Sequence, residues 1–318
     1  LKFAAVFGAN ASGKSNLVRA IDFMRYTVVH GLPNGYSNKY CKADPKNKEL
    51  ASYFEIEIKL GNKYYAYGYE VVLSTGQFQT EWLIELTSDN KEKVIFERDI
   101  VNGIYELDGC LKTKEVYNKI NNYAEDIQDD EKALLLTVMN RNKKNFYQKY
   151  KSAAILQDIY FWMKENLDIN YPDRPISNYS YMANLENVEE VCNMIAAFGT
   201  GITNYQLVEV PPEKVISHLP KEIREQLQNK FEKYTTETEK STDNQQGVGI
   251  IMRSKRDFFI LKMLKGKMIC QTIQFEHNKK DVLFELSEES DGTVRVLDLL
   301  EILLSDEGKT YVIDELDR

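Results

Sequence analysis

The spacing of apolar positions changes several times along the chain, and each change marks a new element. Residues 1–7 form a short apolar run that ends at a glycine, which predicts a strand. After a glycine-rich stretch, apolar residues recur at helical spacing, so one face of a helix is expected to be buried. The predicted buried face consists of Leu17, Ala20, Ile21 and Met24. A surface loop is predicted over residues 31–50, which are rich in Gly, Pro, Asn and Lys.

The next stretch is dominated by strict alternation of apolar and polar residues, from Tyr53 to about Arg98. With turn signals at residues 61–62 and 75–76, this pattern predicts an antiparallel meander. Between residues 113 and 234 the composition shifts to helix-forming residues with few glycines, which predicts a mostly helical insertion. The polar residues 235–246 have the composition of a flexible loop.

The last part of the chain returns to regular patterns. Strand-like alternation covers residues 248–285, a helical apolar period covers 294–304, and residues 311–313 form a buried-strand run. The predicted fold class is therefore α/β, a mixed sheet with an antiparallel β subdomain plus the helical insertion. Its expected parts are an N-terminal lobe (1–110), the insertion (111–246) and a C-terminal part (247–318).

Composition narrows the class of protein. Hydrophobic residues make up 43% and charged residues 28% of the chain, the balance of a soluble globular protein. No apolar run approaches the roughly 20 residues that span a bilayer, and no signal peptide is visible, so a cytoplasmic protein with no membrane partner is expected. The four cysteines are far apart with no Cys-x-x-Cys pair, which favours reduced structural thiols.

Residues 8–15 carry the most specific signal, with the spacing G-x-x-x-x-G-K-S. A loop that wraps a phosphate with its backbone N–H groups needs glycine where side chains would collide, here Gly8 and Gly13. Lys14 is expected to reach the β and γ phosphates, Ser15 to bind magnesium, and the following helix to add its positive end. The predicted nucleotide-binding residues are Gly8, Asn10, Ser12, Gly13, Lys14, Ser15 and Asn16.

A second half of such a site is an acidic pair at the end of a buried strand. Asp314 and Glu315 follow the apolar run 311–313. Asp314 is expected to hold magnesium, and Glu315 to orient the water that attacks the γ-phosphate. Taken alone, this common pattern would indicate an exposed acidic strand end. Together with the glycine loop, it favours a catalytic role for Glu315 and Lys14.

A third candidate lies where the helix of residues 294–304 is expected to begin. Ser290 and Gly292 place small side chains at a helix N-terminus, where backbone N–H groups attract anions. The alternative is an ordinary N-cap supplied by Ser290 or Asp291. Only the order of the three motifs along the chain favours a second anion site.

This order resembles the ABC-type ATPases of the RecF and SMC group. More narrowly, residues 7–17, 289–293 and 313–318 are similar to bacterial "AAA family" ATP-binding proteins of abortive-infection and phage-defence operons. Residues 67–70 and 275–277 add to the similarity. The resemblance implies an ABC-type ATPase head that uses ATP and Mg²⁺. The signature reads Ser-Asp-Gly-Thr instead of Leu-Ser-Gly-Gly-Gln, and the family's phosphate-sensing histidine is not assigned.

The resemblance also implies a head-to-head homodimer that sandwiches two nucleotides. Ser290 and Gly292 of one subunit would close over the γ-phosphate held by Lys14 of the other. Asp317 matches the loop that communicates across such a dimer. Nucleotide would then act as a switch.

Three functions remain open at this stage. The first is an ATPase switch subunit of an anti-phage defence complex that controls a separate effector such as a nuclease. The second is a DNA-binding ATPase of repair or chromosome maintenance, which would use the basic, aromatic-rich run 140–151 as a nucleic-acid contact. A solvated helix face would have the same composition. The third is a module that holds nucleotide for assembly and barely hydrolyses it.

Overall fold

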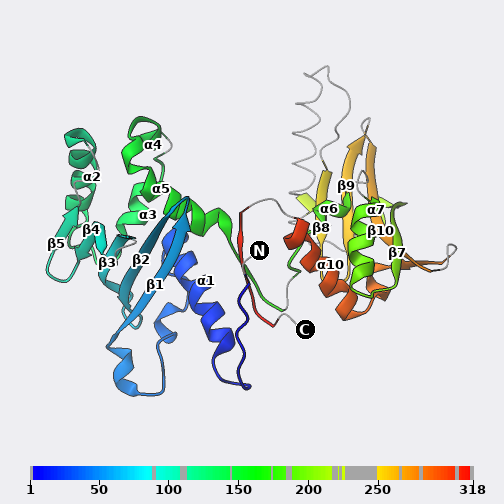
Figure 1. Ribbon diagram of the computed structural model, residues 1–318, viewed down its shortest axis with the longest axis horizontal. Coiled ribbons are helices and arrows are strands. Elements are labelled where there is room, and N and C mark those ends of the chain that lie inside the picture. The colour runs from blue at the N-terminus through cyan, green and yellow to red at the C-terminus, as the bar shows by residue number, and fades with distance from the viewer. Residues whose placement is uncertain are drawn as a thin grey trace. The chain divides into compact units, whose positions relative to one another are not determined.

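The computed structural model divides the chain into two compact units, Leu1–Ile169 and Asn170–Arg318 (Figure 1). Each unit is described by itself. The described residues are 3–87, 91–107, 113–143, 145–172, 175–183, 188–216, 221, 224–225, 249–264, 267–278, 282–304 and 308–315. The predicted polar loop, residues 235–246, lies outside them.

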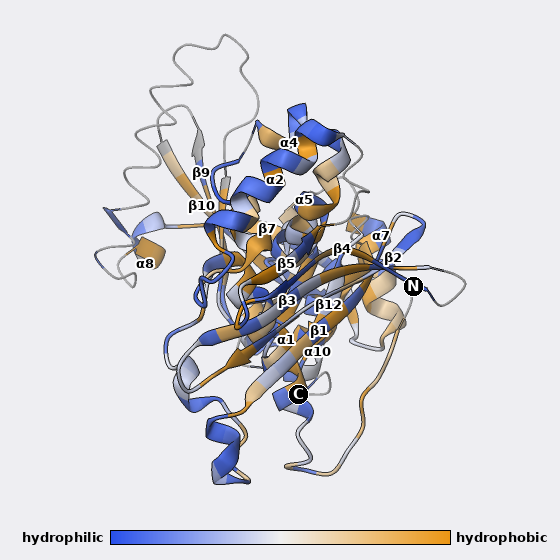
Figure 2. Cartoon of the chain, turned by 90° about the vertical axis from the view of Figure 1, so that its left-hand side faces the viewer, coloured by the Kyte–Doolittle hydropathy of each residue, from blue (hydrophilic) through white to orange (hydrophobic). Residues whose placement is uncertain are grey.

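The first unit is built on a five-stranded antiparallel meander. Its strands are β1 (Ala51–Leu60), β2 (Lys63–Val72), β3 (Gln77–Leu86), β4 (Glu92–Asp99) and β5 (Ile104–Leu107), paired in sequence order. This confirms the predicted meander and extends it by β5. Successive side chains of a strand point to opposite faces, so one face of the sheet carries the buried Tyr67 and Leu83 and the other carries the exposed Tyr53 and Ile104. Figure 2 shows hydrophilic and hydrophobic residues mixed along the strands of this unit.

Helices pack on the inner face of this sheet. They are α1 (Lys14–His30), α2 (Lys114–Asp126), α3 (Leu135–Asn140), α4 (Phe146–Lys149) and α5 (Ala154–Phe161), with shorter 3-10 turns at Tyr36–Asn38, Pro45–Lys48 and Lys151–Ala153 and a π-turn at Trp162–Asn166. Ile120, Leu135 and Ile159 are buried in one core with Tyr67 and Leu83 of the sheet. The helices between 114 and 166, which lie in the region expected to be a mostly helical insertion, therefore belong to the first unit and share its core with the sheet.

A charged pair lies inside this core. Glu81 and Arg98 are both 0% exposed, and Nη1 of Arg98 donates to Oε2 of Glu81 at 2.9 Å. The same carboxylate accepts from the backbone N–H groups of Leu135 at 2.6 Å and Leu136 at 3.1 Å. Glu81 therefore satisfies N–H donors at the start of α3, which an α-helix leaves without internal partners. Sheet and helical layer are joined by this carboxylate.

The second unit contains another antiparallel sheet. Its strand order is β11-β10-β9-β8, and β7 pairs with β10 along the edge opposite to β9 and β11. Its strands are β7 (Ile202–Val210), β8 (Gly249–Arg253), β9 (Phe258–Leu264), β10 (Lys267–His277) and β11 (Leu283–Glu285). Strand β7 falls within the region predicted to be helical, and it is the main departure from the expected elements of this unit. The strands expected over 248–285 are confirmed.

The remaining elements of the described chain are short, apart from one helix. They are β6 (Leu167–Asn170), α6 (Ser180–Ala183), α7 (Val188–Ala197), α8 (Pro212–Ile216), a 3-10 turn (Leu286–Glu288), α10 (Asp291–Leu304) and β12 (Thr310–Ile313). Helices α7 and α10 pack with the sheet in a second core that includes Ile195, Phe275 and Leu297. Across the described ranges, none of the helices combines the length and apolar character needed to cross a membrane.

Candidate nucleotide-binding site

The glycine loop follows a segment that differs from the expected strand. Residues 3–9 form no regular element, and the side chains of Phe3 and Phe7 are 74% and 90% exposed. A strand is maintained by pairing with a neighbour, and no described strand pairs with these residues. The apolar pattern alone therefore overpredicted this element.

The loop itself has the backbone shape that its glycines allow. Gly13 has φ 97° and Ala11 has φ 64°, both in the left-handed region, and the N–H of Ser12 donates to the carbonyl of Ala9 at 3.1 Å. A Cβ atom on Gly8 would lie 2.5 Å from Oγ of Ser12. A side chain at Gly8 would thus force Ser12 to move, and one at Gly13 would strain the backbone.

Helix α1 begins directly at this loop, and no side chain caps the N–H groups at its N-terminus. Gly13 supplies no capping side chain, and the first turn contains no acidic residue. The helix is 17 residues long, so its N-terminal N–H groups and dipole present a positive end. This is an environment that stabilises a phosphate, so the loop fits the group that the sequence predicted.

Lys14 lies folded over the loop. Its Nζ atom donates to the carbonyl oxygens of Gly8 at 2.7 Å and Ala9 at 2.9 Å. The charged amine is thereby held at the loop, where a bound phosphate would meet it. Ser15 follows in the first turn of α1 and is half-buried.

The other end of α1 is anchored in the core. Met24 and Val28 are buried, and Oγ1 of Thr137 on α3 donates to the carbonyl of Val28 at 2.8 Å. Leu17, in contrast, is 50% exposed, so the predicted buried face holds only toward the C-terminal end. The site therefore stands at the solvent end of a helix whose opposite end is fixed.

In the second unit, the start of α10 shows N-cap geometry. Oγ of Ser290 accepts from the N–H of Thr293 at 3.0 Å and lies 2.9 Å from its Oγ1. Gly292 and Ser290 are both exposed. The preceding Glu289 is buried, with Oε1 2.6 Å from Nε2 of His277. The cap that the sequence offered as an alternative is thus present, and a nucleotide contact by these residues stays a prediction.

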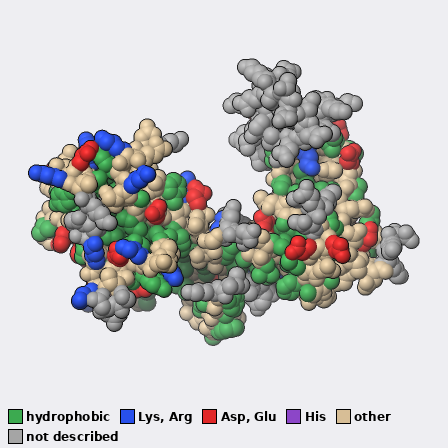
Figure 3. Space-filling view, turned by 45° about the horizontal axis from the view of Figure 1, so that its top comes forward, with side chains coloured by type: hydrophobic (Ala, Val, Ile, Leu, Met, Phe, Trp, Pro, Cys, Tyr) green, Lys and Arg blue, Asp and Glu red, His purple; other side chains and the backbone are tan. Residues whose placement is uncertain are grey.

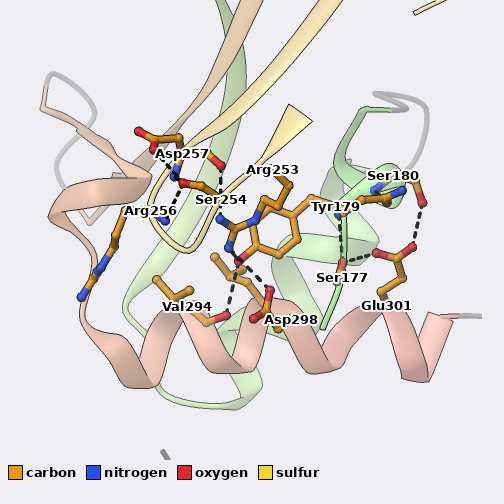
Figure 4. Close-up of polar contacts among 12 residues, drawn as sticks. Ser177, Tyr179, Ser180, Arg253, Ser254, Arg256, Asp257, Val294, Asp298 and Glu301 are labelled. Atoms are coloured by element: carbon orange, nitrogen blue, oxygen red, sulfur yellow. Dashed lines mark hydrogen bonds and ion pairs between the residues drawn. The ribbon is translucent and has the colours of Figure 1, made fainter. Parts of the chain in front are cut away.

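A buried polar cluster holds α10 against β8 (Figure 4). Nη2 of Arg253 donates to Oη of Tyr179 at 2.8 Å and lies 3.6 Å from Oδ1 of Asp298. The Tyr179 hydroxyl donates to the carbonyl of Val294 at 3.3 Å. Burial raises the pKa of Asp298 above its usual range, opposed by the positive charge of Arg253. Sequence reasoning missed this cluster, although a carboxylate at an apolar position of the helix was a visible signal.

A second contact lies at the first turn of α10. Nη2 of Arg256 donates to Oδ1 of Asp291 at 2.6 Å, and its Nη1 donates to the carbonyl of Glu289 at 2.5 Å. Nζ of Lys255 lies 3.8 Å from the same Asp291 oxygen. The turn between β8 and β9 therefore places two cations beside the predicted signature residues.

The acidic pair follows β12. Asp314 is buried, and its N–H donates to the carbonyl of Asn170 at 2.9 Å. Glu315 has φ 53°, and its carbonyl accepts from Nη2 of Arg295 at 2.9 Å. Asp317 lies outside the described residues. The glycine loop belongs to the first unit, whereas Ser290, Gly292 and the acidic pair belong to the second, so the structure shows each group only within its own unit.

A glycine loop with left-handed turns, a lysine folded over it and an uncapped helix behind it together define a P-loop nucleotide-binding domain. Residues 3–153 match the family model described as "AAA domain, putative AbiEii toxin, Type IV TA system". These residues, just under half of the chain, are thus similar to an AAA domain of the abortive-infection type, in agreement with the resemblance drawn from the sequence. Comparison with curated proteins and with solved structures gives no match.

Proposed function

We propose that this protein is an ABC-type ATPase that binds and hydrolyses ATP with Mg²⁺ and acts as the switch subunit of an anti-phage defence complex. The observation that carries the proposal is the loop at residues 8–13, whose backbone and following helix offer N–H groups and a lysine to a polyphosphate. The family description supports the defence context through its reference to an abortive-infection toxin.

Each residue has a defined part in the proposed reaction. Lys14 leaves the carbonyls of Gly8 and Ala9 and donates to the β and γ phosphates. Ser15 and Asp314 would hold Mg²⁺, which when bound would supply positive charge to the phosphate oxygens. Glu315 accepts a hydrogen bond from the water that attacks the γ-phosphate and orients it in line.

The proposed site is completed by a second copy of the chain. Ser290 and Gly292 are exposed at the N-terminus of the 14-residue α10, so its first N–H groups lie at the surface. An anion held by another subunit can therefore approach them. Closure on ATP and opening after hydrolysis would report the nucleotide state to an effector such as a nuclease.

The alternative DNA-binding ATPase is less well supported by the basic run 140–151. Its Tyr147 and Tyr150 are buried in the core, where they cannot stack on bases. Nζ of Lys149 lies 3.1 Å from Oε1 of Glu115, and Nζ of Lys143 lies 4.0 Å from the centre of the Tyr123 ring. Lysine and arginine side chains on the surface of the first unit are interspersed with carboxylates (Figure 3). These contacts favour a solvated helical face.

The proposal is tested by the mass of the full-length protein in solution with Mg²⁺ and ATP. We expect ATP to drive dimerisation of the parent, Lys14→Ala to abolish it, and Glu315→Gln to trap the dimer by blocking hydrolysis. Phosphate release is measured on the same samples. A Glu315→Gln protein with the turnover and assembly of the parent would identify the third function, a module that only holds nucleotide.

Two matched variants control for charge. Lys42→Ala removes an exposed lysine from the first unit, and Glu189→Gln neutralises an exposed glutamate of α7. Both should dimerise and hydrolyse ATP like the parent. If assembly ignores nucleotide in every variant, the composite dimer is wrong and Ser290 is only a helix cap.

A further inference from the structure

The outer face of the β1–β5 meander has no part in the proposed ATPase reaction. The strand register places Glu55, Gly68, Trp82, Glu97 and Glu106 in one row across all five strands. Because neighbouring strands are about 4.8 Å apart, this row is about 19 Å long. A row of that length matches an extended peptide of about six residues.

An aromatic platform lies in the middle of the row. The ring of Trp82 covers Gly68, since a Cβ atom there would fall 2.3 Å from Cζ2 of the indole. Nε1 of Trp82 donates to Oε2 of Glu55 at 2.8 Å, which fixes the ring on the sheet. Tyr53 lies beside it, with ring centres 5.1 Å apart, and is 59% exposed. Gly68 is thus small because the indole occupies the space above it.

The charges nearest this platform are negative, and Lys59, which the register places on the same face, lies toward the end of β1 with its Nζ atom 5.5 Å from the centre of the Tyr64 ring. Glu97 lies directly opposite Glu106, and like charges in that position destabilise an antiparallel pair. Neither of them takes part in an ion pair within the described part of the chain. Glu57 and Glu70 lie on the same face by register. Burial, followed by the negative charges of Glu55, Glu70 and Glu57, raises the pKa of Tyr53 to about 12.

We propose that this face binds a basic, arginine-containing segment of a partner protein. A guanidinium group stacks on Trp and Tyr faces and donates in a fork to carboxylates, and the face presents both within one row. Binding would relieve the repulsion between Glu97 and Glu106, which offers a reason for their placement. The carboxylates in the row around Trp82 repel nucleic acid and other polyanions, so a cationic occupant is favoured there.

The probe for this surface is an oligoarginine peptide, compared with an oligolysine peptide of equal length. In a Trp162→Phe background, Trp82 is the single tryptophan, because the chain contains two. We expect oligoarginine to bind saturably, to change the Trp82 emission, and to bind more tightly than oligolysine. The double variant Glu97→Gln with Glu106→Gln should weaken the affinity for oligoarginine by about tenfold. Anisotropy of labelled peptide repeats the titration with Trp162 intact.

The matched control is Glu189→Gln with Glu190→Gln, which removes the same charge from two exposed positions on α7 of the second unit. Peptide affinity should be unchanged there. If both double variants weaken peptide binding equally, the effect comes from the net negative charge of the whole chain, and the proposal is overturned. An unchanged Trp82 emission on peptide binding would also overturn the proposal, because the peptide would then bind elsewhere. The same holds if Ca²⁺ alone changes the Trp82 emission and the peptide cannot reverse that change.

Discussion

The buried pair of Glu81 and Arg98 allows the sharpest test of how the first unit is held together. We consider Glu81→Gln, which keeps the shape of the side chain and removes its charge. Glu81 accepts from Arg98, from the N–H groups of Leu135 and Leu136, and from the hydroxyl of Tyr67 at 3.1 Å. The amide of glutamine accepts through one oxygen and turns its NH₂ group toward some of these donors.

The expected loss is large, because the guanidinium of Arg98 would stay buried without a counterion. Removing one partner of a buried ion pair costs about 3–5 kcal/mol. That is a large part of the roughly 5–15 kcal/mol that stabilises a typical domain. With a urea m-value of about 2 kcal/mol/M, the unfolding midpoint should fall by about 2 M.

Tryptophan fluorescence measures this unit selectively, since Trp82 and Trp162 are the two tryptophans of the chain and both belong to it. The control is Glu97→Gln, the same substitution at an exposed position of β4, which should change the stability by less than about 0.5 kcal/mol. If Glu81→Gln unfolds at the urea concentration of the parent, the pair does not hold the helices to the sheet.

Three further predictions concern the two units separately. Gly13→Ala imposes about 1–2 kcal/mol of strain at φ 97° and should weaken binding of a fluorescent ATP analogue about tenfold, whereas Gly35→Ala, at φ 75° with open space around it, should not. Ser290→Ala removes the cap of α10 and should lower the protection of its amides from hydrogen exchange by about 1 kcal/mol, whereas the exposed Ser287→Ala should not. Burial raises the pKa of the Cys270 thiol to about 11, so its reactive thiolate appears only as the pH rises toward that value. A thiol reagent below about pH 9 should therefore modify the exposed Cys41 and spare Cys270, as mass spectrometry of the native protein can show.

Local patterns predicted the elements whose partners are close in sequence. The meander follows from period-two alternation and short turns, and α1 ends where Gly31 adopts φ 94°. The phosphate loop was predicted from spacing alone, because each position needs a particular residue type. Its geometry in the first unit agrees with that reading.

Long-range partners were not visible in the sequence. Strand β7 pairs with β10, from Val210 opposite Cys270 to Ile202 opposite His277, so the partners lie 60 or more positions apart along the chain. Nothing local distinguishes such a strand inside a region of helix-forming residues. The sequence also did not predict which face of β3 is buried, since the charged Glu81 points into the core while the aromatic Trp82 points outward. That arrangement becomes stable only with Arg98 on the next strand, a pairing that no single-strand pattern contains.

Because only one end of α1 is fixed in the core, a small rotation at that end produces a larger displacement at the other. Its 17 residues measure about 25 Å, with the core holding the end near Val28 and the loop at Gly13 carried on the other end. A rotation of about 5° at the fixed end would move the loop by about 2 Å, close to the difference between a made and a broken phosphate contact. Core packing around Val28, far from the loop, would then set how accurately the loop meets its ligand. Substitutions there should alter affinity without touching any residue that binds.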